Sequence, residues 1–129
     1  MSTIFSKIIS GDIPCFKVAE NDSFLAFLDI NPLQKGHVLV IPKIEVDYIF
    51  DLDDSVLSDL VVFSKVVANK IKKVFPCEKV GLTVIGLEVP HAHVHLVPMN
   101  KMNDMNFSNS KLELSSDELK SIAELIWNA

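Results

Sequence analysis

Apolar residues recur at helical spacing near both ends of the chain and predict a helix at each end. The N-terminal helix is expected over residues 4–9, where Gly11 and Pro14 close it. Ser115, with Glu118 three residues later, forms a capping-box pattern that starts the C-terminal helix. The apolar stripe of that second helix consists of Leu119, Ile122, Ala123 and Ile126.

The longest apolar stripe predicts one long helix over residues 53–75, with Asp53 or Asp54 as its cap. The core-facing positions are Leu57, Leu60, Val61, Ser64, Val67, Ala68, Ile71 and Phe75. Val62, Phe63 and Val66 widen the apolar face beyond one such stripe. We therefore expect this helix to carry a protein interface as well as core contacts.

Five shorter apolar runs predict strands, at residues 16–18, 24–30, 37–41, 79–85 and 89–97. Asn21-Asp22-Ser23 supplies a hairpin turn between the first two, and Gly86 a tight turn between the last two. Residues 98–110 are rich in Asn, Met and Ser and predict a loop. The expected architecture is a single α+β domain over residues 1–129, with a mostly antiparallel five-stranded sheet and a helical tail from about 111 to 129.

Composition narrows the function classes. The net charge is −5 without any basic run, so a nucleic-acid partner is not expected, because such partners need a positive footprint. Cys15 and Cys77 lie far apart and form no CxxC pattern, which indicates thiols in a reducing compartment. With no signal-peptide pattern and no membrane-length apolar stretch, we expect a cytoplasmic protein.

The chemistry-bearing residues are concentrated in Pro90–Val97. Side chains alternate across a strand, so His91, His93 and His95 should share one face while the apolar residues between them face the core. These are three of the four histidines in the chain. A row of imidazoles on one face would be costly to bury without partners, which favours a functional site.

Two kinds of chemistry fit this row. A His-x-His pair on a strand can donate two ligands to zinc, but the Cα atoms of His91 and His95 would lie roughly 13 Å apart. His37 and the carboxylates remain as outside ligands. Alternatively, a neutral imidazole attacks phosphorus while its neighbours donate protons, and this needs no metal ion or other cofactor. We favour phosphoryl chemistry.

The segment His-Ala-His-Val-His-Leu-Val resembles the signature of the histidine-triad (HIT) family, closest to its HINT-like branch. Residues 3–9 with Ile13-Pro14, then residues 25–32 and 36–43, are similar to the family's other blocks in the same order. The resemblance spans residues 3–98, about three quarters of the chain. His95, where the uridylyltransferase branch has Gln, argues against that branch.

The resemblance implies a HIT-like fold and a hydrolase or transferase that acts on purine nucleotide conjugates. We expect the protein to be a homodimer built on the helix over residues 53–75 and an edge strand. His93 would attack the α-phosphorus and form a nucleotidyl-histidine, oriented by the backbone carbonyl of His91. His95 would contact the phosphate or assist the leaving group, with His37 in support. Asp29 would hold the ribose hydroxyls. The apolar slot for the base would consist of Ile4, Phe5, Ile8, Phe27 and Ile30, although these residues fit plain core packing equally well.

The chain departs from the family pattern in two places. Some members hold a structural zinc with an N-terminal CxxC and a later histidine, but here Thr3, Ser6 and Glu45 stand in those places. We therefore expect no zinc there. Many members also have an Asn- and Gly-rich loop before the triad, which donates hydrogen bonds to the phosphate and leaving group. This chain has only residues 85–88, where Leu87 has no side-chain donor and Glu88 is acidic; Thr83 is the nearest polar substitute.

The expected activity is hydrolysis of a nucleoside phosphoramidate or a related nucleotide conjugate. A dinucleoside polyphosphate hydrolase is the nearest alternative within the same chemistry. A purine-nucleotide-binding module without catalysis and a metal-dependent hydrolase using His91 and His93 remain as alternatives from other classes.

Overall fold

The computed structural model describes residues 3–129, so the first two residues of the predicted domain lie outside it. The described helices are α1 (Ile4–Ser10), α2 (Asp54–Val74) and α3 (Ser116–Trp127). The described strands are β1 (Lys17–Glu20), β2 (Phe24–Leu28), β3 (Val38–Pro42), β4 (Lys79–Thr83) and β5 (Val94–Met99). Two short 3-10 helices, η1 (Ile49–Asp51) and η2 (Met102–Met105), were not predicted from the sequence.

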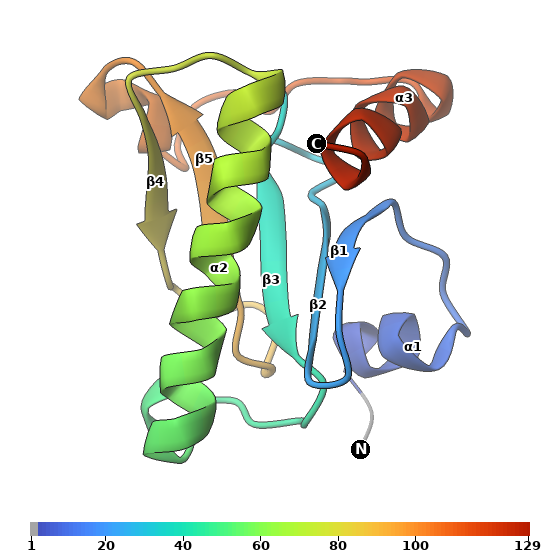
Figure 1. Cartoon of the computed structure of the whole chain (residues 1–129), viewed down its shortest axis with the longest axis vertical. Helices are drawn as coiled ribbons and strands as arrows, with labels where there is room; N and C mark the ends of the chain where they lie inside the picture. Colours follow the sequence, from blue (N-terminus) through green and yellow to red (C-terminus); the bar gives the residue numbers. More distant parts are fainter. Residues whose placement is uncertain (1–2) are drawn as a thin grey trace.

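The strands form a five-stranded sheet in the order β1-β2-β3-β5-β4, and every neighbouring pair is antiparallel. In Figure 1, α2 crosses one face of this sheet, while α3 packs beside β1 and α2. The predicted α+β fold, with its N-terminal, long and C-terminal helices, is therefore confirmed. No helix among residues 3–129 is long and apolar enough to cross a membrane.

The two faces of the sheet bury different sets of side chains. The main core lies between the sheet and helices α2 and α3, and it includes Val40, Val94, Leu96, Leu60, Val67 and Ile126. A smaller cluster on the opposite face includes Phe5, Ile8, Leu25, Phe27, Leu39 and Ile41. His95 is paired with Leu39 across β3 and β5, so the two side chains share this second face.

The long helix follows its predicted stripe with two corrections. Leu60, Val67 and Ile71 are fully buried, but Val61 is 51% exposed rather than part of the core. Phe63, expected at an interface, packs against Phe24 with ring centroids 5.6 Å apart, because it lies at the margin of the core-facing stripe. Asp53 occupies the N-cap position, although its side chain makes no capping hydrogen bond.

The segment that carries the histidines is less regular than predicted. β4 ends at Thr83 and β5 begins only at Val94, so a connection over residues 84–93 replaces the expected tight turn at Gly86. Pro90 has no N–H to donate to a ladder. The N–H of Ala92 is not available for strand pairing either, because it donates to the carbonyl of Val46, 2.7 Å away. His91 and His93 therefore lie before the strand, in a segment that is neither helix nor strand, and only His95 lies within β5.

Candidate active site

A cavity of about 470 Å³ opens on the face of the sheet that carries the smaller apolar cluster. His93, His95 and His37 line it, together with Asp29, which directly follows β2. His91 is fully buried instead and packs against the ring of Phe5, with centroids 5.8 Å apart. The alternation predicted from the sequence holds, since Ala92, Val94 and Leu96 belong to the main core behind.

The hydrogen bond of His93 determines which of its nitrogens can react. Nδ1 lies 2.7 Å from the backbone carbonyl oxygen of His91. A carbonyl oxygen can only accept, so Nδ1 carries the proton and donates it. The lone pair is then on Nε2, the ring nitrogen left free to accept a proton or to attack an electrophile. The contact between His93 and the carbonyl of His91 is the one expected from the sequence.

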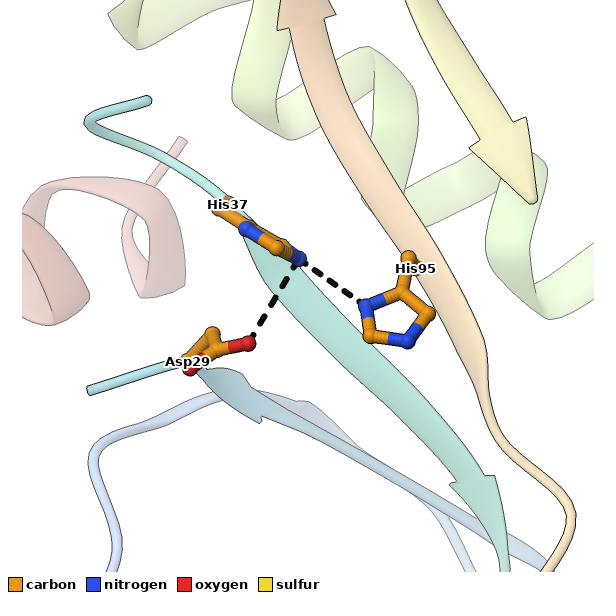
Figure 2. Close-up of side chains that lie close together, drawn as sticks. All are labelled: Asp29, His37 and His95. Atoms are coloured by element: carbon orange, nitrogen blue, oxygen red, sulfur yellow. Dashed lines mark hydrogen bonds and ion pairs between the residues drawn. The ribbon is translucent and has the colours of Figure 1, made fainter. Parts of the chain in front are cut away.

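A second chain of hydrogen bonds determines the proton positions of His37 and His95. The backbone N–H of Leu33 donates to Nδ1 of His37 over 3.0 Å, so the proton of His37 must be on Nε2. That Nε2 lies 3.0 Å from Nδ1 of His95 and donates to it (Figure 2). His95 therefore carries its own proton on Nε2, the nitrogen left to donate to a ligand.

Burial keeps these imidazoles neutral near neutral pH. It lowers the pKa of His95 to about 4, with a further contribution from the neighbouring His93. Burial likewise lowers the pKa of His37 to about 3 and that of His93 below its ordinary value. The contact of 3.6 Å between Nε2 of His37 and Oδ2 of Asp29 is therefore polar rather than an ion pair. A neutral His93 has the lone pair that nucleophilic attack requires.

Asp29, His37 and His95 also bring potential metal-ligating atoms within 4.8 Å of one another. To bind a metal through Nε2, His37 would have to move its proton to Nδ1, where it would face the N–H donor of Leu33. His91 offers no alternative ligand, because its Nε2 lies 2.8 Å from the carbonyl oxygen of Pro42 and donates to it. The arrangement of donors and acceptors does not fit a metal ion.

Thr3, Ser6 and Glu45, the residues at which the family resemblance led us to expect no zinc, form a hydrogen-bonded cluster with His91. Because Nε2 of His91 is the donor, its Nδ1 accepts from the hydroxyl of Thr3, 3.1 Å away. The same hydroxyl accepts from the N–H of Ser6 over 3.0 Å and caps α1. Glu45 accepts hydrogen bonds from the hydroxyl of Ser6 and from the backbone N–H of Thr3, which hold the pKa of its carboxyl below the usual range.

The residues predicted to form the base slot lie in different environments. Phe5 lines the cavity and contacts His93 edge to face, with centroids 5.0 Å apart. Ile8 and Phe27 are buried behind it in the smaller apolar cluster. Ile4 and Ile30 are exposed, at 50% and 59%, and do not line the cavity in this structure. Their contact with a nucleotide base stays a prediction.

Several lining residues were missed by sequence reasoning. Leu39 could have been found, because it lies two residues after His37 and so shares its face of β3. Phe107 and Lys111 could not, because they lie in an irregular segment between η2 and α3. Phe107 contacts His95 with ring centroids 4.9 Å apart. Thr83, considered a substitute donor, pairs with His95 across β4 and β5 but does not line the cavity.

Fold and site together define a class of protein: an antiparallel α+β fold whose neutral, hydrogen-bonded imidazoles line a cavity suited to phosphoryl chemistry. The family model described as the HIT domain matches residues 10–102. The chain belongs to the HIT family.

Individual relatives agree with this assignment. The chain is 36% identical over 132 residues to adenosine 5'-monophosphoramidase hnt1 of Schizosaccharomyces pombe, covering 98% of this chain and 96% of the relative. It is 32% identical to adenylylsulfatase HINT3 of Arabidopsis thaliana, covering 95% of this chain and 65% of that one. Among solved structures, a HIT-like protein from Bartonella henselae superposes with a TM-score of 0.84 at 28% identity, covering 98% and 95% of the two chains.

Proposed function

We propose that this protein hydrolyses nucleoside phosphoramidates or related nucleotide conjugates at the α-phosphate. The observation that carries the proposal is the hydrogen bond from Nδ1 of His93 to the carbonyl of His91, which leaves Nε2 free to attack. The ring of His95, with its proton on Nε2, packs against that of His93 with centroids 5.1 Å apart. The names of the two relatives, a monophosphoramidase and an adenylylsulfatase, support cleavage at a nucleotide phosphorus.

The first step forms a bond from Nε2 of His93 to the α-phosphorus and breaks the bond to the leaving group. The positive charge that develops on the ring of His93 is stabilised by its Nδ1–H bond to the carbonyl of His91. His95 donates a hydrogen bond to the departing group, which takes the proton it needs from water. In the second step water attacks phosphorus, the bond to His93 breaks, and nucleoside monophosphate and protons are released.

We propose that the nucleoside lies along Asp29 and Phe5. The N–H of Asn31 donates to Oδ1 of Asp29 over 2.9 Å and leaves Oδ2 to accept from the ribose hydroxyls. The ring of Phe5 would contact a purine base, with Ile8 and Phe27 as its packing support and Ile4 and Ile30 at the edge of the slot. Asp29→Asn should then raise the KM for a ribonucleotide more than for its 2'-deoxy analogue.

The proposal is tested by the kinetics of His93→Asn, which keeps a donor for the carbonyl of His91 but removes the nucleophile. We expect turnover of adenosine 5'-phosphoramidate to fall by at least about a thousandfold. Full turnover in the variant would overturn the assignment of the nucleophile. Tight nucleotide binding by a wild-type protein without turnover would instead identify a binding module. Faster turnover of a diadenosine polyphosphate than of the phosphoramidate would assign the substrate to the dinucleotide class.

We also propose that the protein is a homodimer assembled through α2 and the free edge of β4. Val62 and Val66 are 62% and 49% exposed on α2, and Leu82 is 50% exposed on β4. An exposed apolar helix face beside an unpaired strand edge is typical of a self-association surface. Val62→Asp should convert a dimer into a monomer in analytical ultracentrifugation. A wild-type monomer at micromolar concentration would contradict the proposal.

A further inference from the structure

The side chains that line the candidate active site carry more negative than positive charge, which is unfavourable for binding an anionic nucleotide. Its lining includes the carboxylates of Asp29 and Glu88, while His37, His93 and His95 are neutral near neutral pH. A phosphate ester adds further negative charge to this cavity. Among the described residues that line it, Lys111 alone is a lysine or arginine.

Lys111 is held at the cavity by its own segment. Its Nζ donates to the carbonyl oxygens of Phe107 and Asn109, at 2.6 and 3.0 Å. The ammonium also lies over the ring of Phe107, 5.8 Å from the centroid, and the same ring contacts His95. An ammonium has three donors, so these two carbonyls leave one N–H for a ligand.

The following residue ties this segment to the loop between β2 and β3, close in sequence to Asp29. The N–H of Leu112 donates to the carbonyl of Pro32 over 2.9 Å, three residues beyond Asp29. Burial raises the pKa of Asp29, and the nearby ammonium of Lys111 partly opposes this rise. Burial lowers the pKa of His37, and Lys111 adds to that lowering, so the charge of Lys111 reaches both residues. Lys111 lies outside residues 10–102, the part of the chain matched by the family model, but its side chain lines the same cavity as the histidines.

We propose that Lys111 is the cation that binds the anionic phosphate group of the nucleotide. The short segment over residues 85–88 supplies no side-chain donor to a phosphate, since Leu87 is apolar and Glu88 repels an anion. Lys111 would supply that donor instead. The site then selects charged nucleotides over neutral nucleosides through a residue from the C-terminal part of the chain. This inference rests on the proposed function, because it assumes that a nucleotide occupies the cavity.

The test compares the dissociation constants of AMP and adenosine by isothermal titration calorimetry. Lys111→Gln removes the charge but keeps a donor for the carbonyls that hold the segment. Loss of one charge-assisted hydrogen bond at this exposed lysine should weaken AMP binding about tenfold and leave adenosine unchanged. Raising the salt concentration should weaken AMP binding to the wild type more than to the variant.

Two further variants separate charge from structure. Lys111→Arg should retain most of the AMP affinity, and Lys120→Gln, at an exposed lysine of α3 that does not line this cavity, should behave as wild type. Unchanged AMP binding in Lys111→Gln, or an equal loss for AMP and adenosine, would overturn the inference while the proposed function stands. A wild type that binds no AMP would overturn both. A wild type that binds AMP without hydrolysing phosphoramidates would overturn the hydrolase alone.

Discussion

Replacing Thr3 by valine removes one hydroxyl that serves two parts of the molecule. Its oxygen caps α1 by accepting from the N–H of Ser6, and its proton is donated to the buried Nδ1 of His91. Valine has nearly the same shape, so the substitution removes the hydrogen bonds of this hydroxyl, including its contact of 3.2 Å with the hydroxyl of Ser6, with little change in packing. Losing the cap costs about 1 kcal/mol. Leaving the nitrogen of a fully buried His91 unpaired costs about 1–3 kcal/mol more.

We therefore expect the free energy of unfolding to fall by about 2–4 kcal/mol in Thr3→Val. Urea denaturation followed by circular dichroism measures this directly, and the midpoint should fall by about 1–2 M with little change in the m-value. Because the carbonyl of His91 holds the ring of His93, kcat should also fall several-fold while KM changes little.

Thr3→Ser is the matched control, because it keeps the hydroxyl and loses only a methyl group. It should remain within about 1 kcal/mol of the wild type and recover kcat. A Thr3→Val variant that unfolds at the wild-type urea concentration would refute the role of the hydroxyl. Equal losses in the serine and valine variants would attribute the effect to packing rather than to hydrogen bonding.

Three other outcomes follow from the structure. Burial holds the folded-state pKa values of His37 and His95 at about 3 and 4, below those of the unfolded chain, so the unfolded chain binds more protons below about pH 6.5. Stability should decrease as the pH falls from 6.5 towards 4, and a constant urea midpoint over that range would contradict this. Since burial also lowers the pKa of His93, kcat/KM should stay level down to below pH 6.5; a decline that begins above pH 7 would count against a neutral nucleophile. Leu60→Ala should lower the free energy of unfolding by about 3 kcal/mol, because Leu60 is fully buried. Leu125→Ala, at a residue 58% exposed, should lower it by less than about 1 kcal/mol. Equal denaturation midpoints for the two variants would contradict this assignment of the core.

The arrangement of the triad was largely predictable because side-chain alternation depends only on local backbone geometry. Ala92, Val94 and Leu96 had to face a core, which placed the histidines on the other side. The start of the strand was not predictable. The strand starts late because the N–H of Ala92 donates to the carbonyl of Val46, a residue far away in the sequence.

The proton positions in the site could not be read from the sequence. They depend on the register that brings β3 beside β5 and thereby places His37 next to His95. The role of Leu33 also requires the fold, since only the backbone path after Asp29 directs its N–H at His37. Sequence patterns identify residue types on a face, whereas hydrogen-bond direction requires the partners on neighbouring segments.

The contribution of the C-terminal part was missed for a similar reason. Phe107 and Lys111 lie in a segment without periodicity, so no pattern directs them to the cavity. Their position is determined by tertiary hydrogen bonds, including the one from Leu112 to Pro32. Conversely, the sequence showed that Thr3, Ser6 and Glu45 depart from the family pattern, but not the hydrogen-bonded cluster that they form with His91.

In the proposed reaction, Nε2 of His93 becomes covalently attached to the nucleotide. The most direct measurement is mass spectrometry of peptides from protein quenched during turnover of an adenosine 5'-phosphoramidate with a slow leaving group. We predict an adenylyl group on the peptide that contains His93, and no such adduct in His93→Asn. An adduct on another residue, or continued turnover by His93→Asn without any adduct, would contradict the account.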